Sequence, residues 1–193
     1  MATFRELLTA DPIDLDAVEA HLNGLSHAQR VEQMRQVPGK LQRKLFAAAN
    51  GRGALEPTYF VPDSVEDRTW VRHEGKNSLP AFSSFAKVFT RPAKGEALWG
   101  YNDSPVGWLV GPGHYILRDG PQDGEMHVDY YSIPPEQVDG APPLKPNDSG
   151  ISTLVYGNMT DTLRRVSEHV TIGRAVKHGK DTENYFLLTR EDV

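Results

Sequence analysis

The sequence predicts a mainly β fold, an antiparallel β-barrel preceded by a small helical region. Short runs of alternating residue type recur between residues 97 and 132, as expected for strands that pack on one face only. Stretches rich in proline and glycine separate these runs and predict turns. In residues 1–50, by contrast, apolar residues recur at the spacing that is typical of helices. We therefore expect a helical N-terminal extension at residues 1–53 and a barrel domain at residues 54–193.

Helix-capping patterns recur in the N-terminal extension. Residues 3–6 (TFRE) and 26–29 (SHAQ) each match a capping box, in which a side-chain oxygen accepts a hydrogen bond from a free backbone N–H. Asp14 or Asp16 would cap a helix between them, and Pro38 suits the first turn of a fourth helix. Because such short helices are marginally stable alone, we expect their apolar stripes to pack on the sheet or on a partner.

The middle of the chain supplies the first strands of the predicted barrel. Residues 82–91 (FSSFAKVFTR) predict a strand with Phe85, Lys87 and Phe89 on one face. The other predicted strands of this part are residues 58–61, 69–73, 98–103 (LWGYND), 107–111 (GWLVG), 114–120 (HYILRDG) and 125–132 (EMHVDYYS). Their number and short spacing favour a closed barrel, which has no exposed edge strand.

The C-terminal part predicts a long loop followed by the closing strands. Residues 133–150 contain repeated prolines, which cannot donate to a β-ladder, so we expect a connector or, at the mouth of a barrel, a lid. Residues 151–157 (ISTLVYG) predict a strand, and residues 160–165 either a helical turn or a continued strand. Residues 169–179 and 185–191 predict a closing hairpin.

The run from residue 159 to residue 190 resembles the closing strands of lipocalin-like (calycin) barrels. In it a Leu-Arg-Arg-Val segment leads into a Thr-Ile-Gly strand, a turn and a Tyr-Phe-Leu-Leu strand. The resemblance covers about the last sixth of the chain, and the Leu98-Trp-Gly-Tyr strand is similar in style to the Gly-x-Trp segments of that family. The chain has no diagnostic lipocalin motif, and its N-terminal helices have no counterpart there. The resemblance implies a small apolar or aromatic molecule bound inside the barrel.

Composition narrows the classes of partner. The net charge is −5 and the basic residues are scattered, so no basic stripe is available to neutralise several phosphates, and we expect no nucleic-acid partner. The chain has no cysteine, which excludes disulfides and thiolate chemistry and fits a reducing compartment. No apolar run is long enough to span a bilayer. We expect a cytoplasmic protein without a membrane span.

His127 and Asp129 are the candidate catalytic residues. They lie two apart on one predicted strand and share a face, as required of a histidine general base oriented by a carboxylate. The opposite face carries Met126, Val128 and Tyr130, so hydrophobicity alone turns the pair towards solvent. If the protein is an enzyme, we expect a lyase, isomerase or hydrolase that uses these two residues.

A metal site would need histidines from several strands. His114, His127 and His169 could converge inside a barrel, but the sequence contains no close-spaced pair of ligands to support this. We therefore expect no metal and no cofactor.

The aromatic residues favour a lined pocket over a plain core, because tyrosine and tryptophan carry polar tips that an apolar core does not need. The predicted ligand-binding residues are Trp99, Trp108, Tyr130 and Tyr156 for the apolar wall, and His169 or Arg174 for the polar end. The predicted function is binding of a small hydrophobic or aromatic metabolite inside the barrel. The alternatives left open are the enzyme described above and a structural or interaction module, and the partners are the small molecule and a second copy in a homodimer.

Overall fold

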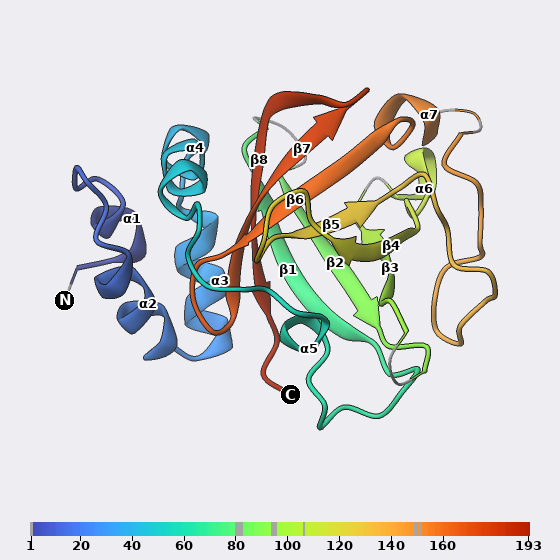
Figure 1. Cartoon of the computed structure of the whole chain (residues 1–193), viewed down its shortest axis with the longest axis horizontal. Helices are drawn as coiled ribbons and strands as arrows, with labels where there is room; N and C mark the ends of the chain where they lie inside the picture. The colour runs from blue at the N-terminus through green and yellow to red at the C-terminus, as the bar shows by residue number, and fades with distance from the viewer. Residues whose placement is uncertain (1, 80–82, 94–95, 106, 149, 151) are drawn as a thin grey trace.

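The barrel prediction is confirmed by the computed structural model, which describes residues 2–79, 83–93, 96–105, 107–148, 150 and 152–193 (Figure 1). Eight antiparallel strands follow one another around a closed barrel, and the last pairs with the first. The strands are β1 (Val71–Asn77), β2 (Ser84–Thr90), β3 (Trp99–Asp103), β4 (Tyr115–Asp119), β5 (Met126–Asp129), β6 (Met159–Arg165), β7 (Val170–Lys177) and β8 (Lys180–Arg190).

The four helices described in the N-terminal extension, residues 1–53, lie together on one side of the barrel (Figure 1). Both capping boxes are present, at Thr3 and Ser26, and Asp14 caps the helix between them. Pro38 is the N-cap of the fourth helix, one position earlier than predicted. The helices of the chain are α1 (Phe4–Leu7), α2 (Leu15–Asn23), α3 (His27–Arg35), α4 (Gly39–Ala48), α5 (Pro57–Phe60), α6 (Gly107–Val110) and α7 (Ser152–Val155).

The N-terminal helices cover the outer face of β7 and β8. Ile172 and Leu187 point outward from these strands and share one buried cluster with the apolar stripes of the helices. Phe46 of α4 lies against two guanidinium groups of the barrel, with Arg164 and Arg174 at 4.0 and 4.8 Å from its ring centre. The expected packing of the helices on the sheet is therefore present, and it combines apolar burial with cation–π contacts.

Large aromatic side chains fill the barrel interior. Tyr115 and Phe186 lie directly across the ladder from Gly100 and Gly173. A Cβ atom at either glycine would come within 2.3 Å of the facing ring, so each ring occupies the space that a side chain would take. Glycine at these positions allows a large ring to lie flat on the barrel wall.

Helix α5 closes one end of the barrel. Phe60 is fully buried, with its ring centre 5.0 Å from that of Phe89 and 5.6 Å from that of His73. His73 Nε2 lies 3.0 Å from the carbonyl oxygen of Phe60. Burial lowers the pKa of His73 to about 3, so the imidazole is neutral and its Nε2–H donates to this carbonyl.

Three predicted strands were wrong. Helix α5 takes in all of the predicted strand 58–61 except Val61, and α6 forms most of the predicted strand 107–111. Helix α7 lies within the predicted strand 151–157, of which Ile151 is outside the described residues. These short apolar runs lie at the ends of the barrel, where the closed ladder has no edge left for a further strand. Pro57 also starts α5 at a position that favours proline. Residues 160–165 continue as strand within β6, and Phe82 of the predicted 82–91 strand lies outside the described residues.

Gly100→Ala should destabilise the protein by about 1–3 kcal/mol, because the new methyl group collides with Tyr115 and with the carbonyl of Val88. Gly24→Ala is the matched control, since its Cβ would meet only ordinary contacts at 3.5 Å or more. Urea unfolding followed by circular dichroism measures both variants. Equal midpoints for the two would contradict the close packing of the Tyr115 ring on Gly100.

His73 should make the folded protein sensitive to acid. Between pH about 6.5 and about 3 the unfolded chain binds a proton here that the folded protein excludes, so stability falls as pH drops, by up to about 1.4 kcal/mol per pH unit. His73→Leu should be less stable at neutral pH but should show a flatter loss on acidification. The exposed His178→Asn should keep the wild-type slope, and an unchanged slope in His73→Leu would show that His73 is not the group responsible.

Candidate functional site

Lys87 is a fully buried lysine inside the barrel. It points inward from β2, and only 1% of its surface is exposed. Its ammonium Nζ lies 2.9 Å from Asp161 Oδ2 and donates to Asn102 Oδ1 at 3.0 Å and to the hydroxyl of Tyr130. All three N–H groups thus have an acceptor, and the charge has a buried carboxylate partner. We call Lys87, Asn102, Tyr130 and Asp161 the lysine cluster.

Barrel closure brings the lysine cluster together from four segments. Lys87 and Asn102 are directly opposite each other on β2 and β3. Asp161 lies on β6 opposite Val128, and Tyr130 directly follows β5. Because β2 and β6 are not neighbours in the sheet, the ion pair crosses the interior of the barrel.

The surroundings of Lys87 favour a cation in spite of burial. Desolvation lowers the pKa of Lys87, and Asp161 opposes this shift by its charge and its hydrogen bond. The ring centres of Tyr115 and Tyr130 lie 4.9 Å from Nζ, and that of Phe186 lies 5.3 Å away. Burial, followed by the charge of Asp161, raises the pKa of Tyr130 well above its usual value. Tyr130 therefore stays protonated and can donate to Asp161 Oδ2, 3.2 Å away.

Tyr156 covers the lysine cluster at the mouth of the barrel. Its ring stacks on Tyr130 with 5.4 Å between centres and 21° between planes. It also lies against Gly113, which has φ +56° and where a Cβ would come within 2.5 Å of the ring. Helices α6 and α7 lie close by, joined by a hydrogen bond from Ser152 Oγ to the carbonyl of Val110 at 2.7 Å (Figure 1).

An open cleft of about 630 Å³ lies at this mouth. One wall comes from the proline-rich loop, which is fixed to the barrel where Asn147 Nδ2 donates to the carbonyls of His114 and Tyr130 at 2.7 and 2.9 Å. The lining includes Asn102, Trp108, Pro112, Pro143, Lys145 and Ser152. Asn102 therefore belongs both to the cleft and to the lysine cluster.

Apolar side chains are exposed beside the cleft. Trp108 and Leu109 on α6 are 84% and 48% exposed, and Leu154 and Val155 on α7 are 75% and 36% exposed. Exposed large apolar groups gathered in one place are typical of a binding surface.

The predicted ligand-binding residues lie in different parts of the molecule. Tyr130 and Tyr156 adjoin each other at the lysine cluster, and Trp108 lines the cleft. Trp99 points to the outer face of β3, where it is buried. Arg174 also points outward, and its guanidinium pairs with Asp181 at 2.7 Å.

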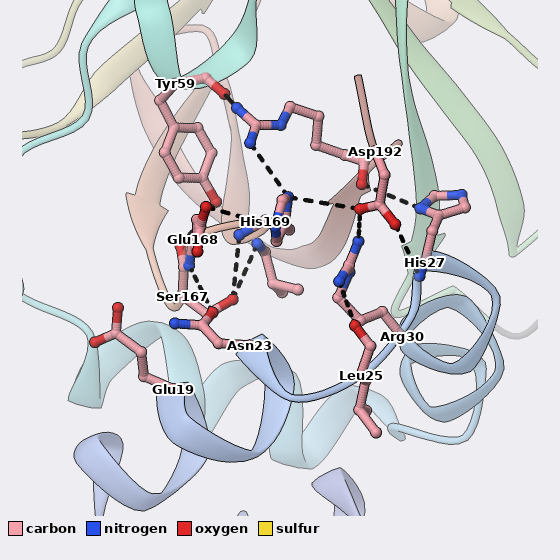
Figure 2. A network of polar contacts seen from close by, with 12 residues as sticks. Glu19, Asn23, Leu25, His27, Arg30, Tyr59, Ser167, Glu168, His169 and Asp192 are labelled. Carbon is pink, nitrogen blue, oxygen red and sulfur yellow. Dashed lines mark hydrogen bonds and ion pairs between the residues drawn. The ribbon is translucent and has the colours of Figure 1, made fainter. Parts of the chain in front are cut away.

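His169 belongs to a separate polar network near α5 and the C-terminus (Figure 2). Its Nδ1 accepts from the guanidinium of Arg190 at 3.2 Å and lies 3.9 Å from Asp192. Asp192 pairs with Arg30 and accepts from the backbone N–H of His27, both in α3. This network ties α3 to the end of β8, so His169 serves the attachment of the helices and lies away from the cleft.

The catalytic candidates His127 and Asp129 face outward, as the hydrophobic pattern predicted. Asp129 Oδ2 accepts from Arg118 at 3.0 Å, and its Oδ1 accepts from the backbone N–H of Tyr131 at 2.9 Å. The carboxylate is thus held by groups other than the imidazole. Burial lowers the pKa of His127, and its Nδ1 has no hydrogen-bond partner among the residues that the structure describes.

Among the described residues, no group of three His, Cys, Asp or Glu side chains is arranged to hold a metal ion. Among the same residues, no helix has the length and hydropathy required to cross a bilayer.

Sequence reasoning missed Lys87, Asn102 and Asp161. Only Lys87 could have been recognised from the sequence, because it lies between two phenylalanines on one face of a predicted strand. A lysine in that position must either reach solvent at the edge of the sheet or be buried with a partner. Neither Asn102 nor Asp161 stands out in the sequence.

Comparison of the chain with protein-family models, with curated proteins and with solved structures finds no match.

Asp161→Asn should destabilise the protein by about 3–5 kcal/mol, because it leaves the buried ammonium of Lys87 without a counter-charge. The loss should shrink as pH rises and the lysine deprotonates, and Lys87→Met combined with Asp161→Asn should recover much of it. Asp181→Asn breaks the more exposed pair with Arg174 and should cost less than about 1 kcal/mol. Urea unfolding at several pH values measures all of these variants, and similar losses at Asp161 and Asp181 would contradict a buried cross-barrel ion pair.

Proposed function

We propose that the protein binds one small hydrophobic or aromatic molecule bearing a polar group in the cleft at the mouth of the barrel. The observation that carries this proposal is Asn102, which is one of the residues that line the cleft and whose Oδ1 accepts a hydrogen bond from Lys87. A bound polar group at Asn102 would thus meet a preorganised buried ion pair. Perturbed charged groups beside a cleft are typical of binding and active sites.

The size and lining of the cleft suit such a molecule. Small-molecule sites usually enclose about 300–1,000 Å³ and combine apolar walls with a few polar groups. Here Trp108 and Pro143 offer apolar surface, while Asn102, Lys145 and Ser152 offer polar atoms. The resemblance of the closing strands to lipocalin-like barrels points to the same kind of ligand.

Because side chains fill the interior of the barrel, we place the proposed ligand at the mouth and not inside, where the sequence predicts it. Phe89, Tyr115 and Leu117 are at most 2% exposed inside the barrel, so the apolar part of a ligand would lie at the mouth. A barrel filled by its own side chains also agrees with the alternative of an interaction module. The cleft and the buried ion pair that is hydrogen-bonded to its residue Asn102 favour ligand binding. The cytoplasmic location and the homodimer stay predictions.

Trp108→Ala should weaken binding of an aromatic probe such as 2-naphthalenemethanol at least about tenfold, because it removes a large apolar wall of the cleft. Titration calorimetry measures the affinity. Tyr131→Ala is the matched control, since Tyr131 is an aromatic residue 61% exposed outside the cleft lining, and it should bind the probe like the wild type. Equal affinities for all three proteins, or no saturable binding, would exclude the cleft as the site.

A further inference from the structure

The amino group of Lys87 is hydrogen-bonded to a residue of the cleft. Asn102 is among the residues that line the cleft, and its Oδ1 accepts from Lys87 Nζ at 3.0 Å. Its Nδ2 donates to the carbonyl of Gly113 at 3.1 Å and to the hydroxyl of Tyr130 at 3.0 Å. Access from the cleft to the amine along this contact would require the amide of Asn102 to move.

We propose that Lys87 captures the carbonyl group of an apolar or aromatic aldehyde or ketone as a protonated imine. The inference rests on the proposed function and deepens it, because it names the polar group of the ligand. The lysine cluster supplies the groups that the reaction requires, namely an amine, a carboxylate and a phenol within hydrogen-bond distance of one another.

The reaction balances with these groups alone. The ammonium of Lys87 passes a proton to Asp161, and the freed lone pair attacks the carbonyl carbon. A C–N bond forms, the C=O π bond breaks, and Tyr130 donates a proton to the oxygen and regains one from Asp161. The resulting carbinolamine loses its hydroxyl group as water, taking one more proton from the nitrogen by way of Tyr130. The net change is one ammonium and one carbonyl giving one iminium and one water, and one positive charge is kept.

The surroundings of Lys87 suit the product as well as the reactant. An iminium carries the same charge as the ammonium, so Asp161 stays its counter-ion and the rings of Tyr115 and Phe186 still face a cation. Burial excludes the water that would hydrolyse the imine. The iminium nitrogen carries fewer N–H groups than the ammonium, so Asn102 Oδ1 loses its donor. Asn102 is also the residue that must move to admit the ligand.

Reductive trapping tests the inference. The intact protein is incubated with 2-naphthaldehyde and sodium cyanoborohydride, which reduces an iminium to a stable amine, and the labelled lysines are identified by peptide mass spectrometry. Lys87 should be labelled at least about tenfold faster than the exposed Lys40, because binding in the cleft raises the local aldehyde concentration. Asn102→Ala should speed the labelling of Lys87 further. Lys87→Arg keeps the positive charge and should lose the fast label.

The outcomes separate this inference from the proposed function. Label confined to exposed lysines such as Lys40 and Lys145, in both the wild type and Asn102→Ala, would overturn capture by Lys87. The matched alcohol, 2-naphthalenemethanol, cannot form an imine, so saturable binding of the alcohol together with that result would keep the cleft as a binding site. If Lys87→Arg fails to fold, Lys87→Met with Asp161→Asn serves as the variant without an amine.

Discussion

The ion pair between Lys87 and Asp161 is the constraint on which the arrangement of the barrel depends. It joins β2 to β6 across the interior, between strands that share no backbone hydrogen bonds. A buried charge is tolerated only where its partner and its remaining hydrogen bonds are in place. Asn102 and Tyr130 complete these bonds, and the rings around Nζ enclose the group. The positions of four segments are thereby coupled to the presence of one ammonium group.

The two ends of the barrel differ in kind. At one end Phe60 and His73 form a closed plug, and the network of Arg190, His169 and Asp192 attaches the N-terminal helices (Figure 2). The other end carries the cleft and the exposed apolar residues of α6 and α7. His73 and Arg190 at the closed end are bonded to groups of the fold, whereas Asn102 of the lysine cluster also belongs to the lining of the cleft. This asymmetry supports placing function at the open mouth.

Local signals in the sequence predict much of the fold, but they predict the site poorly. Capping boxes located α1 and α3, and alternation located β2 and the closing hairpin, because these patterns depend on neighbouring residues. Four-residue apolar runs do not distinguish a strand from a helix, which explains the errors at α6 and α7. The lysine cluster depends on register around a closed barrel, and no local pattern encodes that Lys87 meets Asp161. Arg174 was predicted to hold the polar end of a ligand inside the barrel, but it points outward and its guanidinium lies over the ring of Phe46.

Whether the mouth of the barrel holds a small molecule can be read from native mass spectrometry of the protein purified gently from its own cells, compared with the denatured mass of the same sample. A molecule bound at the mouth should add mass to the native protein that is lost on denaturation, or kept after borohydride reduction, and that is reduced in Trp108→Ala. A native mass equal to that of the bare chain, or the same added mass on the wild type and on Trp108→Ala, would contradict binding at the mouth.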